Sequence, residues 1–118
     1  MKDQGAYLGH IIDAIQDIQL YAGVGRDAFM AERMRQDAIV RKLEIIGQAV
    51  KNLSDETKEL APSTPWRRIA GMRDRLTHEY FGVDLNLVWT VVERELPLLR
   101  TAVADLIVRL GSPSSEDR

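Results

Sequence analysis

Residues 38–50 read AIVRKLEIIGQAV, and this stretch decides the fold class. Apolar residues recur in it, and just beyond it, at intervals of three and four: Ile39, Leu43, Ile46, Val50 and Leu53. That spacing gathers them on one face of an α-helix and leaves the charged residues on the others. The pattern predicts one long amphipathic helix that begins at Asp27, a suitable N-terminal cap, and runs to about Leu53.

Comparable apolar stripes precede and follow this helix. Residues 3–22 carry one made of Tyr7, Ile11, Ala14, Ile18 and Ala22, and residues 84–110 carry one made of Val88, Val92, Leu96, Leu99, Val103, Leu106 and Leu110. Both predict amphipathic helices, the second with a cap at Asp84. Because Pro97 lies inside the last helix, we expect a kink there, where the carbonyl of Glu93 loses its usual partner.

Two shorter helices are predicted between the long ones. Ser54 can cap a short helical turn. Thr64 and Pro65 then form a strong start signal, a hydroxyl cap followed by proline at the first helical position. We expect this second helix to end near Tyr80, because Gly82 follows as a C-terminal stop.

These elements predict an all-α fold, an antiparallel helical bundle of about four main helices plus a short one. The chain has 118 residues, enough for one hydrophobic core and little more, so residues 1–110 should form a single domain. Residues 111–118 are polar, and we expect them to be a disordered tail. A bundle this small often leaves an apolar face uncovered, so we also expect a two-fold homodimer.

The composition narrows the class of protein. There is no cysteine, which excludes disulfides and thiolate metal sites. The net charge of −2 argues against a surface coated in positive charge for binding duplexes. The start of the chain lacks a signal-peptide apolar region, and no apolar run approaches the roughly 18 residues that span a bilayer. We therefore expect a cytoplasmic protein with no membrane partner.

The residues that could carry chemistry gather in residues 73–80, which read RDRLTHEY. The chain has only two histidines, so acid–base chemistry near neutral pH is most plausible at His78 in this segment. Four arginines against two acids give residues 65–80 a local charge of +2. Such a patch suits a phosphate-bearing ligand, with Arg67 and Arg75 as candidate phosphate contacts.

Helical geometry constrains how these residues could cooperate. On one continuous helix Asp74 and His78, four residues apart, lie nearly above one another, so a carboxylate–imidazole hydrogen bond is feasible. Arg73 and His78 are five residues apart, about 140° around the axis, and do not meet on a straight helix. Either the helix unwinds before His78, or the arginine of one subunit works with the histidine of another.

Each of these features also has a purely structural interpretation. A histidine near a helix C-terminus often only interacts with the helix dipole, and an arginine-rich run is more often a solvated face than a site. We interpret His10, beside the apolar stripe of the first helix, as structural. No Walker A, HExxH or GxGxxG motif occurs, and the two histidines lie far apart without a carboxylate cluster. We therefore expect neither a bound metal nor a cofactor.

Three segments in order resemble the HEPN superfamily, specifically the HepT-like ribonuclease toxins of prokaryotic toxin–antitoxin pairs. The pattern Arg73-x4-His78-x-Tyr80 resembles the signature of that family, and the surrounding PWRRIAGMRDRLTHEYFGVD resembles its most characteristic segment. Residues 38–50 resemble its second long helix, and LVWTVVERELPLL, ending at residue 99, resembles the start of its last helix. The likeness covers nearly the whole chain apart from the tail. Arg68 and Gln48 depart from the family pattern, which more often has an acid at these positions.

The resemblance implies roles for particular residues. Arg73 and His78 would be the catalytic pair, and Asp74 would support and orient the histidine. Tyr80 matches the tyrosine that a cognate antitoxin, a minimal nucleotidyltransferase, modifies with AMP from ATP. The family fold is a helical bundle that dimerises with the two motifs facing one cleft, and further assembly with the antitoxin is compatible with it. The substrate would be RNA, for which tRNA is a reasonable guess.

The residue types fit this implied activity, and two other classes of function stay open. An imidazole can move the protons and a guanidinium can bind the phosphate in a metal-independent cleavage of RNA. The chain could instead be a non-catalytic subunit that delivers a substrate or nucleotide to a separate nucleotidyltransferase. It could also be a plain helical dimerisation module, which would have no affinity for RNA.

Overall fold

The computed structural model describes residues 3–78 and 82–116, and its first helix, α1 (Gln4–Ala22), begins at a side-chain cap. Asp3 Oδ1 accepts a hydrogen bond from the backbone N–H of Ala6 at 3.3 Å. This bond satisfies one of the amides that a helix leaves unpaired at its start. The helix buries one side, formed by Leu8, Ile11, Ala14, Ile15 and Ile18. The predicted first helix is thereby confirmed.

The second predicted helix, residues 27–53, is two helices in the structure. α2 (Arg26–Ala31) ends before Glu32, whose backbone is extended, and α3 (Arg33–Lys51) begins directly after it. The side-chain amide of Gln36 stabilises the break, since it donates to two carbonyls at the end of α2, at 2.9 and 3.0 Å. Those carbonyls have no partner within α2. The predicted apolar stripe nevertheless forms the buried face of α3.

α4 (Asp55–Glu59) is the predicted short helix, and it anchors the chain before the next element. The Oγ of Ser54 accepts from the backbone N–H of Thr57 at 3.1 Å, which confirms the predicted cap. The indole N–H of Trp66 donates to the carbonyls of Lys58, in α4, and Ala61, in the turn after it, each at 3.1 Å. Trp66 is buried and opens α5 (Trp66–Ala70), so this contact fixes where α5 begins.

The helix predicted over residues 65–80 is interrupted twice. α5 ends at Gly71, and α6 (Met72–Leu76) follows as a separate short helix. α6 ends at Leu76, four residues before the predicted end, and the backbone of Thr77 is extended. The expectation of one helix through Tyr80 is therefore wrong, and Tyr80 itself lies outside the described residues.

A two-residue antiparallel strand pair replaces the end of the predicted helix. β1 (Thr77–His78) pairs with β2 (Gly82–Val83) in an antiparallel arrangement. The backbone N–H of Asp84 donates to the carbonyl of Leu76 at 2.8 Å, which ties the two ends of the segment together. Gly82 has a φ of 76°, a conformation that glycine adopts without steric cost.

The last part of the chain is one continuous helical run, made of α7 (Leu85–Thr90), the π-helical η1 (Val91–Glu95) and α8 (Leu96–Glu116). It begins at Asp84, whose Oδ1 accepts from the backbone N–H of Leu87 at 3.1 Å, as predicted.

The irregularity in this run lies just before Pro97 and is a π-turn. The N–H of Leu96 donates to the carbonyl of Val91, five residues back instead of four. A proline ring clashes with the carbonyl four residues before it, and a widened turn is one way to relieve that crowding. The helix then continues to Glu116. Extending an existing helix orders only one residue for each hydrogen bond gained.

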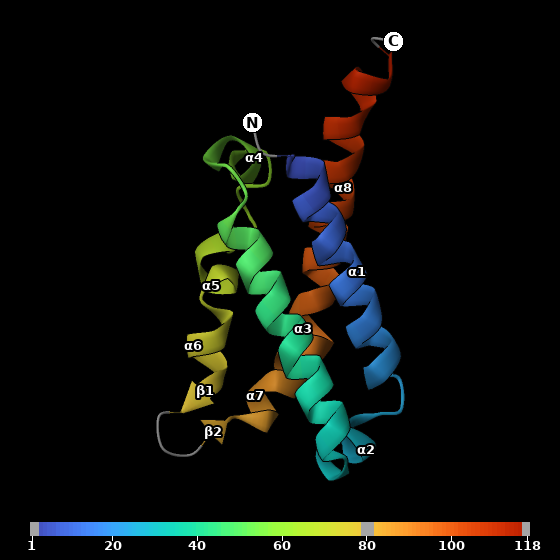
Figure 1. The fold of residues 1–118 in the computed structure, drawn as a ribbon, viewed down its shortest axis with the longest axis vertical. Coiled ribbons are helices and arrows are strands. Elements are labelled where there is room, and N and C mark those ends of the chain that lie inside the picture. The colour runs from blue at the N-terminus through green and yellow to red at the C-terminus, as the bar shows by residue number, and fades with distance from the viewer. Residues whose placement is uncertain (1–2, 79–81, 117–118) are drawn as a thin grey trace.

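Figure 1 shows how these elements form the bundle: α1 descends, α3 ascends beside it, α5 and α6 descend on the far side of α3, and α7 to α8 ascend again. α1 packs against both α3 and α8, and α5 packs against α3. The predicted all-α antiparallel bundle is confirmed. Among the helices described, none has the length and apolarity that crossing a membrane requires.

A glycine allows the close packing of α5 and α6 on α3. A Cβ added at Gly47 would lie 3.1 Å from the carbonyl oxygen of Ile69 and 3.4 Å from that of Ala70. The absence of a side chain at this position therefore lets the junction of α5 and α6 approach the backbone of α3. This junction immediately precedes Arg73, so Gly47 helps to set where that arginine lies.

Candidate active site

Arg73 lies on α6 beside α3, with its side chain directed to solvent. The side chain is 80% exposed, and its Nε lies 4.0 Å from Oε2 of Glu44 on α3. An ion pair this long and this exposed contributes little to stability. The guanidinium therefore keeps its donors available for a ligand such as a phosphate.

The end of α6 resolves one question that helical geometry left open. The helix unwinds before His78, whose backbone pairs with Gly82 in the strand pair instead of continuing the helix. Arg73 lies near the start of α6, and His78 lies two residues beyond its end. Asp74 and His78 are therefore not four residues apart on one unbroken helix.

Asp74 and Arg67 are both at the surface. Asp74 lies in the first turn of α6, where a carboxylate interacts favourably with the helix dipole. Arg67 is exposed on α5 and has no ion-pair partner within residues 3–78 and 82–116. Its guanidinium is thus available for a phosphate, as the sequence suggested.

Arg75, the other candidate phosphate contact, is already engaged. Its guanidinium donates to both carboxylate oxygens of Glu95, at 2.8 and 2.5 Å, and its side chain is only 16% exposed. Arg68 lies 3.5 Å from the same carboxylate. Bidentate geometry of this kind is the strong form of the arginine–carboxylate pair. Arg75 therefore holds α6 to the π-turn.

The electrostatics of this pair follow from its geometry. The hydrogen bonds from Arg75 lower the pKa of the Glu95 carboxyl, against partial burial, and the charge of Arg68 adds to the effect. The hydrogen bond to Glu95 likewise raises the pKa of Arg75. Glu95 was not among the site residues predicted from the sequence. The feature that could have pointed to it is its position in the Glu-Leu-Pro triplet, just before the expected kink.

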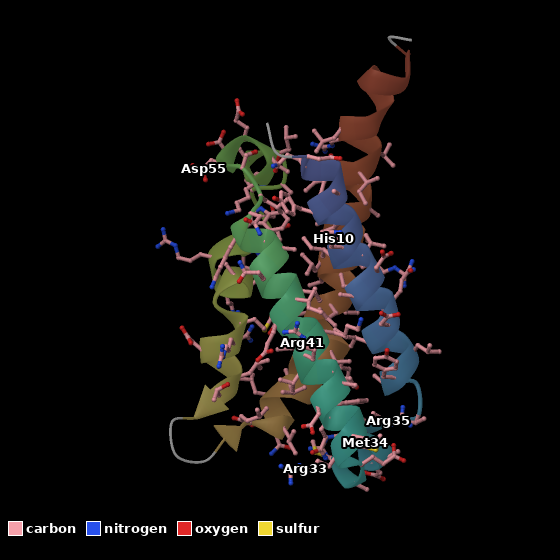
Figure 2. All side chains as sticks on the ribbon, viewed as in Figure 1. His10, Arg33, Met34, Arg35, Arg41 and Asp55 are labelled. Atoms are coloured by element: carbon pink, nitrogen blue, oxygen red, sulfur yellow. The ribbon has the colours of Figure 1, made fainter. Side chains whose placement is uncertain are left out.

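Beside Arg73 the surface forms an open groove of about 380 Å³. Its walls come from α1, α3 and the junction of α5 and α6, and its polar lining includes Tyr7, His10, Arg41, Glu44, Gln48, Lys51, Asn52 and Arg73. Figure 2 shows His10 on α1 and Arg41 on α3 at the face turned to the viewer. His10, which the sequence suggested is structural, is exposed in this groove.

Comparison with known proteins identifies the family. Residues 11–106 match the protein family described as "Ribonuclease HepT-like". The chain is 41% identical over 108 residues to the "Putative RNase TTE0752" of Caldanaerobacter subterraneus subsp. tengcongensis, covering 91% of this chain and 96% of that protein. It is also 41% identical over 95 residues to the "Probable ribonuclease HepT" of Thermococcus cleftensis, covering 80% and 86%.

A third relative is longer than this chain. The "Gamma-glutamylcyclotransferase and putative RNase MJ0434" of Methanocaldococcus jannaschii is 41% identical over 110 residues, which are 92% of this chain and 50% of that protein. The chain thus spans about half the length of this relative. No solved structure matches the chain significantly. From the family match and the two relatives of similar length, the chain belongs to the HepT-like ribonuclease family, and ribonuclease is the enzyme class that this membership gives it.

Proposed function

We propose that this chain is the toxin of a toxin–antitoxin pair and cleaves RNA internally, without a metal, through Arg73 and His78. The observation that carries the proposal is the state of Arg73. Its guanidinium is 80% exposed beside an open groove, with only a long contact to Glu44, while the helix ends before His78. An exposed guanidinium five residues before a histidine suits the recognition of a phosphodiester.

The chemistry uses the nucleophile that RNA carries. His78 takes the proton of the 2′-hydroxyl, and the 2′-oxygen attacks the adjacent phosphorus. The new O2′–P bond forms as the P–O5′ bond breaks, and the 5′-oxygen leaves with a proton. The products are a 2′,3′-cyclic phosphate and a 5′-hydroxyl, and addition of water converts the first to a 3′-phosphate. Arg73 stabilises the negative charge that builds up on the phosphoryl oxygens.

Supporting roles complete the site. Asp74, three residues before the strand pair, orients the histidine, and exposed Arg67 contacts a flanking phosphate. Arg75 is not retained as a phosphate contact, because Glu95 occupies its donors.

We propose that a cognate minimal nucleotidyltransferase neutralises the toxin at Tyr80. The tyrosine oxygen would attack the α-phosphorus of ATP, so that AMP is attached, pyrophosphate leaves and the hydroxyl proton is lost. The adduct adds bulk and negative charge two residues from His78. Repulsion and steric exclusion would then keep RNA phosphates away.

A homodimer also belongs to this proposal, with the two motifs facing one cleft. Large apolar side chains are exposed on α8, with Leu98 at 74% and Val108 at 67%, which supports an interface there. Light scattering of the purified chain at several concentrations gives its mass in solution. A mass of one chain at every concentration would remove the dimer from the proposal.

RNA cleavage by unmodified protein in excess EDTA tests the activity, with His78→Ala measured beside it. Intact mass first establishes that no AMP is attached. We expect cleavage by the wild type only, with 2′,3′-cyclic or 3′-phosphate ends in mass spectrometry. Absence of cleavage of total cellular RNA would instead favour a binding subunit that serves a nucleotidyltransferase.

A further inference from the structure

The groove beside Arg73 concentrates positive charge on a chain whose net charge is negative. Three of its lining residues, Arg41, Lys51 and Arg73, are cationic, and Glu44 is its acid. The groove therefore carries about +2, counted as three cations less one carboxylate, whereas the whole chain carries −2. Charge segregated in this way indicates an anionic ligand larger than a single phosphate.

The cations in the groove are not committed to partners within the bundle. The side chain of Arg41 is 72% exposed, and its Nη1 lies 3.8 Å from Glu44, a contact as loose as that of Arg73. Lys51 is exposed and forms no ion pair within the described residues. Glu44 thus lies between two guanidinium groups without neutralising both, and their spare donors face the groove.

The groove runs along α3, which contributes Arg41, Gln48 and Lys51 to its lining. Arg41 and Lys51 are ten residues apart on this helix, a separation of about 15 Å along its axis. Gln48 lies between them on the same groove wall, exposed, and its side-chain amide makes no hydrogen bond within the described part of the chain. A row of cation, amide and cation matches alternating phosphates and bases along an extended strand.

We propose that this groove binds single-stranded RNA next to the scissile phosphate, with Arg41 and Lys51 contacting successive phosphates and Gln48 contacting a base. This inference rests on the proposed function at Arg73 and extends it to residues outside the motif. A single strand is the form that fits, because its unpaired bases are accessible to a side chain such as Gln48. A duplex is instead recognised across a wide and shallow surface.

Salt dependence of RNA binding tests this assignment. Each phosphate contact to a single strand adds about 0.7 to the slope of log affinity against log salt concentration. The protein carries His78→Ala throughout, so that the probe, a fluorescent mixed-sequence oligoribonucleotide, stays intact. Arg41→Gln and Lys51→Gln should each lower the slope by about 0.7, and together by about 1.4.

Arg33→Gln is the matched control, since Arg33 lies on the same helix, exposed and outside the groove (Figure 2). It should leave the slope unchanged. Circular dichroism and urea unfolding of each variant verify that the bundle is intact. Equal slopes for the groove variants and the control would overturn the proposal, as would tighter binding of a blunt duplex of the same length.

The outcomes separate this inference from the proposed function. If the wild type cleaves RNA but Arg41→Gln and Lys51→Gln leave the slope unchanged, the catalytic proposal is supported and the proposal that the groove binds RNA is contradicted. If these variants lower the slope but the wild type does not cleave RNA, RNA binding in the groove is supported and the catalytic proposal is contradicted. If the wild-type chain does not bind RNA at all, the groove assignment is wrong.

Discussion

The guanidinium of Arg75 and the carboxylate of Glu95 meet in two parallel hydrogen bonds, of 2.8 and 2.5 Å. The two residues are twenty positions apart in the sequence, one on α6 and one at the end of the π-turn. The pair therefore joins α6, which carries Arg73 and precedes the strand pair in the chain, to the helical run that follows the strand pair.

Removing one partner of this pair should destabilise the bundle. Glu95→Gln leaves the Arg75 guanidinium, 16% exposed, without its counter-charge. We expect the free energy of unfolding to fall by about 1–2 kcal/mol, because both groups keep some contact with solvent. Urea unfolding measures this loss. Glu93→Gln, at an exposed position of the same turn, is the control and should change it by less than about 0.5 kcal/mol.

The same pair predicts how stability depends on pH. The pKa of Glu95 is lower in the folded chain than its ordinary value, because Arg75 donates to the ionised carboxylate. Its contribution is therefore complete above the pKa of the unfolded chain and is lost as pH falls through the folded pKa. Chemical unfolding across the acid range should show a steeper loss for the wild type than for Glu95→Gln. If the two curves are parallel, ionisation of Glu95 makes no contribution to the free energy of unfolding.

The packing of α5 on α3 predicts opposite effects for two glycine substitutions. Gly9→Ala on α1 places a Cβ with nothing within 4 Å and should stabilise the chain by about 0.5–1 kcal/mol, the usual advantage of alanine in a helix. Gly47→Ala brings its Cβ within 3.1 Å of the Ile69 carbonyl, which is backbone. We expect it to lose about 1 kcal/mol or more, since overpacking exceeds the helical gain.

Activity measurements on the same two variants extend this test to the site. Gly47→Ala should also lower RNA cleavage, because it displaces the backbone just before Arg73, whereas Gly9→Ala should not. A gain in stability at both positions would show that α5 can move away from residue 47 without lowering the free energy of unfolding.

Arg73→Ala should separate activity from stability. The side chain is 80% exposed, so the free energy of unfolding should change by less than about 0.5 kcal/mol. Cleavage should fall about 10²–10³-fold, the usual effect of losing one donor to a charge that develops in the transition state. Arg94→Ala, at another exposed arginine, should leave cleavage intact. Undiminished cleavage by Arg73→Ala would remove Arg73 from the mechanism.

The helices could be predicted from the sequence where local chemistry decides them. The caps at Ser54 and Asp84 depend on a side chain and an amide three residues away, and both are present in the structure. The break at Glu32 could not be predicted in the same way. It depends on Gln36 donating to carbonyls of a separate helix, a contact that the spacing of apolar residues does not show.

The site was harder to predict than the bundle for a related reason. Residues 73–80 have the composition of a helix, and the motif pattern named Arg73 and His78 but not their geometry. What ends α6 is a hydrogen bond from Asp84 to Leu76 and pairing with a glycine of positive φ, both supplied by residues downstream. The loose contact of Arg73 with Glu44 is likewise a contact between helices. Spacing within one helix cannot reveal it.

The π-turn also explains the spacing of the apolar stripe in the last helical run. Val88, Val92 and Leu96 are buried at two successive intervals of four, which in a regular α-helix would advance the stripe by about 80° around the axis. One residue more in the turn at Val91–Glu95 absorbs that advance, so α7 and α8 remain in phase. The π-turn therefore accommodates one extra residue, and the buried apolar residues of α7 and α8 still lie on the same side of the helical run.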